Sequence, residues 1–279
     1  MNYQWYPGHM TKAVRMMQEN IKLVDLIIEV IDCRIPMSSR NPDIDSLAAN
    51  KFRIVILNKA DLADPLVTAQ WMDYFKEKGI HVLELNAKSA VGMKGVQRIV
   101  EEACKEKIER DRKRGIVNRP VRAMVAGIPN VGKSTFINSF AKKACAKTGN
   151  KPGVTKGKQW IKLNKGLELL DTPGILWPKF EDNRVGKHLA FIGSMNDEVI
   201  IMDKLACDLI DTLRTDYKSA LEDRYGISVQ DKAYDVLCQI AESRKCYSKN
   251  ETLDTEKAAN LLVDDFRSGR LGRISLENP

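Results

Sequence analysis

Residues 127–134 read GIPNVGKS and fit the phosphate-loop pattern G-x-x-x-x-G-K-[ST]. In this pattern the glycines let backbone N–H groups surround phosphate oxygens, the lysine neutralises them and the hydroxyl binds Mg²⁺. Residues 121–126 before the motif read as a short buried strand, and residues 135–143 after it read as a helix whose N-terminus faces the phosphates. Because a phosphate loop requires this strand-loop-helix setting, we predict a nucleotide site that uses Lys133 and Ser134.

Apolar strand-like runs and helical patterns alternate through the first part of the chain. We expect strands at 24–31, 52–57, 80–85, 121–126, 159–163 and 167–170, and helices at 11–23, 65–78, 93–114 and 135–143. This alternation predicts an α/β domain with a mostly parallel sheet and helices on both faces. After residue 178 only helical patterns remain, at 197–213, 217–224, 231–242 and 254–267. We therefore predict an α/β domain over 1–176 and an all-α domain over 177–279.

The composition is that of a globular protein without a membrane segment. The 279 residues, 43% of them hydrophobic, can form one full core and a smaller second one. No apolar run approaches the ~20 residues of a membrane span, and residues 1–10 lack the apolar core of a signal peptide. The cysteines form no C-x-x-C pair and lie mostly in apolar segments, which is typical of reduced, buried thiols. We expect a cytoplasmic protein with no membrane partner.

The positive charge is concentrated in one block. Between Arg112 and Leu167 there are 14 Lys and Arg and no Asp or Glu, whereas the rest of the chain has 31 Lys and Arg against 37 Asp and Glu. A single nucleotide needs only a few cations, so the block favours a larger polyanion, and nucleic acid is the first candidate. The alternative is a basic solvent-exposed face without a partner.

Residues 58–61 read NKAD, directly after an expected strand, and fit the N-K-x-D pattern by which GTPases recognise guanine. Guanine presents paired N1–H and N2–H₂ donors that adenine lacks. ATP would leave a carboxylate at Asp61 unpaired, and such a mismatch costs ~10⁴-fold or more in discrimination. We expect Lys59 to lie along the base and ribose, and Asn58 to tie neighbouring loops together.

Three shorter motifs complete the predicted site. Residues 86–88 (NAK) resemble the supporting guanine motif, whose backbone N–H contacts the base oxygen; the alternative is an ordinary turn. Residues 171–174 (DTPG) fit D-x-x-G, in which Asp171 lies near Mg²⁺ and the N–H of Gly174 contacts the γ-phosphate. Thr155 is the candidate switch threonine, which coordinates Mg²⁺ only while the γ-phosphate is present, and Thr148 is the alternative.

The order of these motifs carries a family resemblance. In ordinary GTPases the phosphate loop, the switch threonine and D-x-x-G precede N-K-x-D, but here N-K-x-D comes first. The chain thus resembles a circularly permuted GTPase. Together with YPGHM at 6–10 and DCRIP at 32–36, the motifs resemble those of the YlqF/RbgA family over essentially the whole chain. The resemblance implies a bacterial GTPase of large-ribosomal-subunit (50S) assembly with a helical, RNA-binding C-terminal domain.

The motifs and the resemblance together define the expected ligands. The predicted GTP and GDP site comprises Asn58, Lys59, Asp61, Asn86, Ala87, Lys88, Asn130, Val131, Gly132, Lys133, Ser134, Thr135 and Gly174. Mg²⁺ is expected on Ser134, Thr155 and Asp171. Asn130 resembles the position that binds potassium in several GTPases lacking the catalytic glutamine, so a K⁺ ion is a further candidate.

Ile175 follows D-x-x-G at the position where many GTPases place a water-orienting glutamine. An apolar side chain cannot orient water, so we expect slow intrinsic turnover that a partner accelerates. His9 is the candidate catalytic histidine, since Pro7 and Gly8 place it in a flexible loop and the family motif includes it. The alternative is a histidine that caps or packs the first helix. The expected catalytic set is then His9, Lys133, Thr155 and Gly174.

Permutation places the helical domain directly after the D-x-x-G switch. We hypothesise that contacts of the γ-phosphate at Gly174 set the orientation of that domain and make the protein a nucleotide-dependent clamp on its partner.

Eight lysines surround the expected switch loop: Lys142, Lys143, Lys147, Lys151, Lys156, Lys158, Lys162 and Lys165. Lysines of this kind give salt-sensitive, sequence-tolerant RNA binding. Residues 177–279 carry 15 Lys and Arg against 19 Asp and Glu, so RNA would need a local face there, and docking on protein is the alternative.

The leading interpretation is an RNA-associated GTPase of ribosome assembly that acts as a monomer on ribosomal RNA or a large-subunit assembly intermediate. One alternative is an ATP-dependent P-loop kinase, which Asp61 disfavours. The other is a GTP-gated scaffold whose hydrolysis is incidental.

Overall fold

The computed structural model of the chain describes residues 18–116, 119–148, 160–164, 166–171, 182–230 and 232–279. These residues form two compact units. The described residues up to 171 form an α/β unit that also contains Glu277–Pro279, and residues 182–276 form a helical unit.

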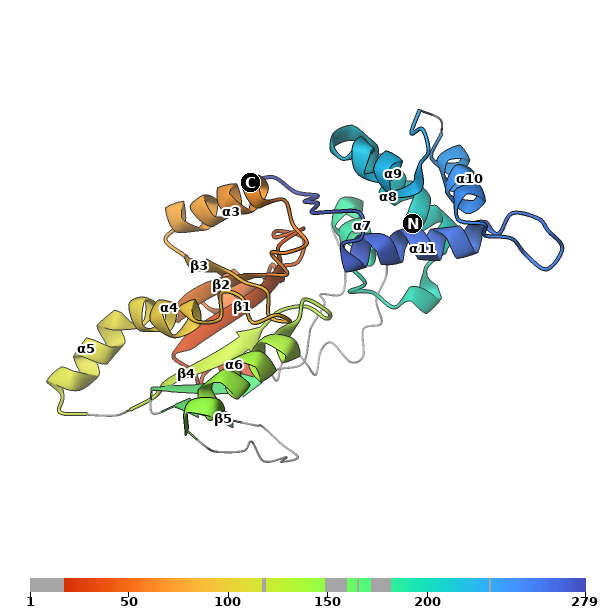
Figure 1. The fold of residues 1–279 in the computed structure, drawn as a ribbon. Helices are drawn as coiled ribbons and strands as arrows, with labels where there is room; N and C mark the ends of the chain where they lie inside the picture. Colours follow the sequence, from red (N-terminus) through yellow and green to blue (C-terminus); the bar gives the residue numbers. More distant parts are fainter. Residues whose placement is uncertain (1–17, 117–118, 149–159, 165, 172–181, 231) are drawn as a thin grey trace. The chain divides into compact units, whose positions relative to one another are not determined.

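The α/β unit is built on one six-stranded sheet (Figure 1). Its strands are β1 (Leu26–Asp32), β2 (Phe52–Asn58), β3 (His81–Glu84), β4 (Val121–Ala126), β5 (Trp160–Asn164) and β6 (Leu167–Asp171). They lie in the order β3-β2-β1-β4-β6-β5, and every neighbouring pair is parallel except β5 with β6. All six expected strands are present, and the mostly parallel α/β sheet is confirmed. The residues of β1 and most of those of β2, β4 and β6 are buried because helices cover both faces, whereas the edge strands β3 and β5 are partly exposed.

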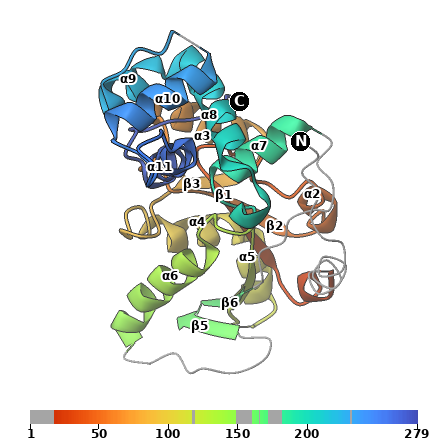
Figure 2. The ribbon, with the colours of Figure 1, turned by 90° about the vertical axis from the view of Figure 1, so that its right-hand side faces the viewer.

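Helices cover the two faces of the sheet in different ways (Figures 1 and 2). On one face, Trp71 and Phe75 of α3 (Pro65–Glu77) pack in one cluster with Ile31 of β1 and with Val55 and Leu57 of β2. The carboxylate of Asp64 begins this helix by accepting hydrogen bonds from two N–H groups of its first turn. On the other face, α4 (Gly95–Ala103) packs on β2 and β3, and α6 (Lys133–Thr148) packs on β4, β5 and β6.

Several helices differ from the sequence-based expectation. The single helix expected at 93–114 is two helices, α4 and α5 (Lys105–Lys113), separated at Cys104, whose backbone leaves the helical region (φ −100°, ψ 14°). No proline or glycine marks this break in the sequence. The short helix α2 (Ile44–Leu47) was not expected, and α6 begins at Lys133, inside the phosphate motif. Of the helix expected at 11–23, only residues 18–23 are described, and 18–21 are helical.

The helical unit contains α7 (Asn183–Phe191), a 3₁₀ turn η1 (Asp197–Val199), α8 (Met202–Asp216), α9 (Lys218–Tyr225), α10 (Ala233–Ser243) and α11 (Thr255–Ser268). Its core lies between α8, α10 and α11, whose buried faces follow the helical period. The four helices expected from sequence are present, although the first begins at Met202 rather than at 197. Helix α7 was not expected.

Asp265 of α11 is a buried charge in this core. It accepts hydrogen bonds from Arg224 at 2.7 Å and from the Tyr225 hydroxyl at 2.9 Å, and it pairs with Arg270. Burial alone would raise the pKa of Asp265, but these donors hold that pKa below its ordinary value. The carboxylate therefore joins α9, α11 and the segment after α11.

The domain prediction of 177–279 differs from the structure at its end. Glu277–Pro279 group with the α/β unit, because the side chain of Glu277 finds its hydrogen-bond donors there.

The cysteines whose side chains are described are free thiols, and burial raises the pKa of Cys104 to about 12. No helix in the described part of the chain is long and apolar enough to cross a membrane. The cytoplasmic location stays a prediction.

Candidate nucleotide site

The candidate site lies at the edge where the parallel strands end. Strand β4 runs directly into the phosphate loop of residues 127–134, and the register places Asp32 beside Asn58 and Val125 beside Asp171. The carboxyl ends of β1, β2, β4 and β6 therefore meet at one edge, where open α/β sheets bind their ligands.

The phosphate loop needs glycine at two positions. Gly127 has a φ of 150°, and a Cβ atom there would lie 2.4 Å from the carbonyl oxygen of Val30 in the neighbouring strand. Gly132 has a φ of 96°, and a Cβ atom there would lie 2.4 Å from Nδ2 of Asn58. A larger residue at either position would push the loop away from the sheet. Asn130 is also left-handed, with a φ of 62°, a conformation that asparagine tolerates better than most residues.

The start of α6 carries the residues expected to hold phosphate. Lys133 is buried, and its Nζ donates a hydrogen bond to the carbonyl of Ile128 at 2.8 Å, across the loop. Ser134 and Thr135 follow in the exposed first turn of the helix. A helix N-terminus, a lysine and an exposed hydroxyl together fit a phosphate chain with Mg²⁺.

Asn58 joins three segments of the chain. Its Nδ2 donates a hydrogen bond to the carbonyl of Val131 at 2.7 Å, and its Oδ1 accepts one from the N–H of Ala87 at 3.0 Å. The side chain is buried, so neither bond competes with bulk water. Ser139 of α6 adds a hydrogen bond to the carbonyl of Ala87 at 2.6 Å. The N-K-x-D segment, the N-A-K segment and the phosphate loop are thereby held as one unit.

Lys59 makes a second bridge to the phosphate loop. Its Nζ donates to the carbonyl of Asn130 at 2.7 Å and pairs with the Asp32 carboxylate at 2.9 Å. The backbone of Lys59 is left-handed, with a φ of 59°, which costs energy in a residue with a side chain. These contacts keep Lys59 in that conformation.

Asp32 is the buried counter-charge of this lysine. Its two carboxylate oxygens each accept a hydrogen bond from the Arg34 guanidinium, both at 2.9 Å. Burial would raise the pKa of Asp32, but Arg34 and Lys59 hold that pKa well below its usual range. Asp32 is therefore ionised over the whole physiological range. The role of Asp32 was not predicted from the sequence, although its position at the end of a buried strand, beside the strand that leads into N-K-x-D, is a usable signal.

The remaining guanine-motif residues lie beside these bridges. Asp61 is exposed, two residues after Lys59, and the N–H of Ala60 donates to the carbonyl of Leu85 at 3.2 Å. Oδ1 of Asn86 accepts hydrogen bonds from Lys88 and Ser89, which fixes the turn around Ala87. The arrangement places an exposed carboxylate and the turn of residues 86–89 next to the phosphate loop.

Other expected site residues are described in part or not at all. His9, Thr155 and Gly174 lie outside the described residues. Asp171 is the last residue of β6, and only its backbone is described. Thr148 is the last residue of α6. Among the described side chains, no three His, Cys, Asp or Glu gather as a metal site. A Mg²⁺ at a phosphate loop needs no such group, because hydroxyl and phosphate oxygens supply much of its coordination.

Known proteins are similar to this chain in sequence. A family model described as 50S ribosome-binding GTPase matches residues 122–247. Ribosome biogenesis GTPase A of Priestia megaterium is 45% identical over 281 residues, which cover 100% of this chain and 98% of that protein. Its counterpart from Thermotoga maritima is 31% identical over 99% of this chain and 94% of that protein.

A solved structure is similar over nearly the whole chain. The crystal structure of GNP-bound YlqF from T. maritima has a TM-score of 0.69 at 26% identity, and covers 96% of this chain and 98% of its own. Its GDP-bound counterpart has a TM-score of 0.70 at 25% identity. The full-length identity to the P. megaterium protein and the similarity of fold to YlqF point to the same family as the order of the motifs. The chain therefore belongs to the ribosome biogenesis GTPase A (YlqF/RbgA) family, as its permuted motifs predicted.

Proposed function

We propose that the protein binds GTP across residues 58–61, 86–88 and 127–134, hydrolyses it to GDP and phosphate, and acts on the large ribosomal subunit during its assembly. The observation that carries this proposal is the pair of bridges by which Asn58 and Lys59 bind the guanine motif to the phosphate loop. The relatives that span the whole chain are ribosome biogenesis GTPases, which supports the same substrate and the same particle.

Base recognition is assigned to Asp61. Its exposed carboxylate is available to accept both donors of the guanine edge. Residues 86–88 are the proposed contact of the base oxygen, and the hydrogen bond from Ala60 to Leu85 holds them next to the N-K-x-D segment. ATP presents no matching pair of donors and would leave the carboxylate unpaired. The proposed site therefore favours GTP over ATP.

Phosphate binding is assigned to the loop and to the start of α6. Lys133 and the N–H groups of the first helical turn neutralise the phosphates, and Ser134 is the proposed Mg²⁺ ligand, with Thr155 and Asp171 as the further proposed ligands. When bound, Mg²⁺ supplies positive charge to the oxygens that become more negative during transfer. Gly174 stays the proposed γ-phosphate contact.

The catalytic group remains a proposal. Ile175 cannot orient water, so turnover is slow until the ribosomal particle is bound, and His9 is the proposed residue that then acts on the water. Asn130 is exposed and left-handed in the phosphate loop, and its side-chain oxygen is the proposed ligand of a K⁺ ion beside the phosphates. Such an ion would stabilise transition-state charge.

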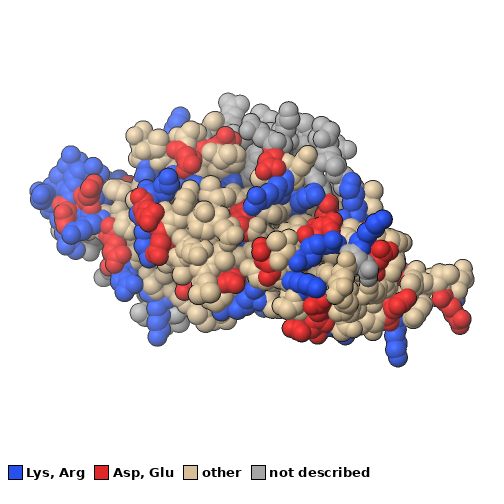
Figure 3. Space-filling view, turned by 90° about the horizontal axis from the view of Figure 1, so that it is seen from above, with Lys and Arg blue, Asp and Glu red and all other residues tan. Residues whose placement is uncertain are grey.

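The basic block is the proposed RNA contact. Figure 3 shows Lys and Arg side chains gathered over the end of α5, where the first residues of the block, Arg112, Lys113 and Arg114, are exposed. In the helical unit, Arg267 is held by the carbonyls of Ala190 and Phe191 and by Asp197. Lys245 and Lys249 are exposed after α10 and are the better candidates for RNA contact there.

The nucleotide-dependent clamp is a further part of the proposal. Small-angle scattering profiles recorded with GDP and with a GTP analogue test it, and equal profiles would count against it.

Asp61→Asn should abolish the preference for GTP. The amide replaces an acceptor pair with one acceptor and one donor, so we expect GTP affinity to fall about a hundredfold or more while ATP affinity stays the same. Isothermal titration calorimetry measures both. Asp73→Asn, an exposed aspartate on α3, is the matched control and should change neither. An unchanged ratio of GTP to ATP affinity in Asp61→Asn would refute the assignment.

GTP turnover should be faster in KCl than in NaCl at equal ionic strength. Asn130→Gly keeps the left-handed backbone but removes the side-chain oxygen, so it should lose most of this difference. Phosphate release under single-turnover conditions measures the rate. Equal rates of the wild type in the two salts would remove K⁺ from the proposal.

The protein should co-sediment with large-subunit assembly intermediates in a GTP analogue more than in GDP, and these particles should raise its GTPase rate. Reversing the charge of Arg112, Lys113 and Arg114 should weaken the association and flatten its salt dependence. Sucrose-gradient fractions with and without added salt provide the measurement. Equal sedimentation in both nucleotides, with no stimulation by particles, would contradict the proposed role.

A further inference from the structure

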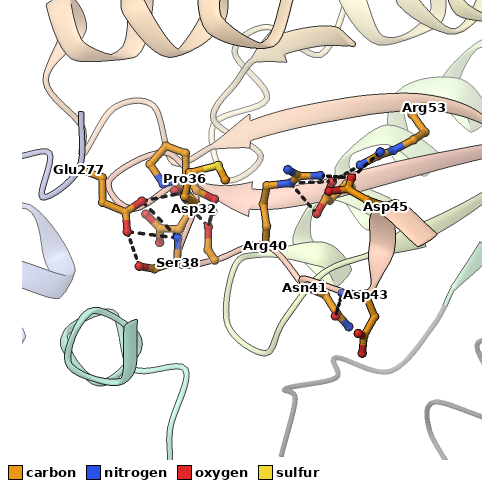
Figure 4. Close-up of polar contacts among 12 residues, drawn as sticks. Asp32, Pro36, Ser38, Arg40, Asn41, Asp43, Asp45, Arg53 and Glu277 are labelled. Atoms are coloured by element: carbon orange, nitrogen blue, oxygen red, sulfur yellow. Dashed lines mark hydrogen bonds and ion pairs between the residues drawn. The ribbon is translucent and has the colours of Figure 1, made fainter. Parts of the chain in front are cut away.

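The side chain of Glu277 is seated in the loop that follows β1 (Figure 4). Its carboxylate accepts a hydrogen bond from the N–H of Met37 at 2.8 Å, one from the N–H of Ser38 at 3.1 Å, and one from the Ser38 hydroxyl. Glu277 is only 7% exposed. Burying a carboxylate costs folding free energy unless several donors satisfy it. The three donors around Glu277 therefore form a specific binding site for its carboxylate.

The backbone of the same residue is also held. Nε1 of Trp71 donates a hydrogen bond to the carbonyl of Glu277 at 3.0 Å. Trp71 is buried in α3 and packs against Phe75 in the core of the α/β unit. Glu277 is thus fixed at its carboxylate and at its carbonyl, both within the α/β unit.

The next residue of the loop continues toward the nucleotide site. Oγ of Ser39 accepts a hydrogen bond from the N–H of Asp32 at 3.0 Å, and the N–H of Ser39 donates to the carbonyl of Ile35 at 2.9 Å. Ser39 is fully buried. The position of residues 37–39 therefore bears directly on the backbone of Asp32.

Asp32 connects this loop to the phosphate loop. Its carboxylate pairs with Lys59, and Lys59 in turn donates to the carbonyl of Asn130. We call this chain of contacts from Glu277 to Lys59 the path. The far end of the loop has a different support (Figure 4): Arg40 pairs with Glu29 and Asp45, and Arg53 pairs with the same two acids. Those ion pairs brace residues 40–45 on β1 and β2. The N–H groups of Met37 and Ser38 instead use the carboxylate of Glu277.

We propose that Glu277 is a positioning residue of the guanine-nucleotide site, which acts through Ser38, Ser39 and Asp32 on Lys59. This inference rests on the proposed nucleotide site. It also gives the helical unit a second connection to that site, since the peptide bond between Leu276 and Glu277 joins the two units. By linkage, a nucleotide that is bound more tightly when Glu277 is seated must also hold Glu277 more tightly.

The test measures binding of a fluorescent GDP analogue to full-length variants. Glu277→Gln keeps the size of the side chain but turns an NH₂ group toward N–H donors, so we expect affinity to fall about five- to twentyfold, less than the loss from removing a direct ligand. Asn278→Ala, the exposed neighbour, is the matched control and should stay within twofold of the wild type. Glu277→Asp, which keeps the charge, should recover part of the affinity.

A second measurement separates positioning from general stabilisation. In a Lys59→Ala background, adding Glu277→Gln should weaken binding by less than twofold, because the path ends at Lys59. Hydrogen exchange of residues 37–39 should be faster in Glu277→Gln without nucleotide, and saturating GDP should slow that exchange in the wild type. If Glu277→Gln does not fold, Ser38→Ala tests the same contact and should cost about two- to fivefold in affinity.

The outcomes distinguish this inference from the proposed function. If the wild type binds GDP and the Glu277→Gln variant binds it with equal affinity, the positioning role is overturned and the proposed nucleotide site stands. A full additive loss in the Lys59→Ala background overturns the path through Lys59. A wild type that binds no guanine nucleotide overturns the proposed site and, with it, this inference. In that case the exchange data still report whether Glu277 holds the loop.

Discussion

The two hydrogen bonds of the Asn58 amide are the interaction on which the candidate nucleotide site depends. The amide donates to the carbonyl of Val131 and accepts from the N–H of Ala87, and it is buried, so both hydrogen bonds are made without competition from water. These three residues lie far apart in the chain but meet at one edge of the sheet. The bridge is made in space, so the order in which the segments occur along the chain does not matter to the pocket. A permuted sequence can therefore build the same site as an unpermuted one.

The bridge also requires a close approach that few residues allow. Gly132 is in contact with Asn58, and Gly127 is in contact with β1, so neither position has room for a side chain. Lys59 and Asn130 adopt left-handed conformations on the two sides of the hydrogen bond that joins them. The strain is held by the buried Asp32–Arg34 pair behind Lys59. A site that is already rigid before its ligand arrives loses less entropy on binding.

Much of the fold was predictable because its signals are local. The buried strands are continuous apolar runs bounded by polar turns, and the phosphate loop and N-K-x-D each occupy a few consecutive residues. The features that were missed either have no local signal in the sequence or depend on residues far away in the chain. The break at Cys104 has no proline or glycine to mark it, and α7 is short and follows a segment without a clear pattern. The roles of Asp32 and Glu277 depend on partners 27 and 239 residues away, Lys59 and Ser38, which no periodicity or short motif reports. The described part of the site contains the base and phosphate segments, whereas the assignments of His9, Thr155 and Gly174 still rest on motif and resemblance.

The most direct measurement is the affinity of Asn58→Ala for GDP by isothermal titration calorimetry, with circular dichroism as the check on folding. If one buried amide holds the base and phosphate segments together, affinity should fall by about a hundredfold or more while the spectrum is unchanged, because both segments lose their shared partner at once. A folded Asn58→Ala variant that binds GDP within threefold of the wild type would contradict the account.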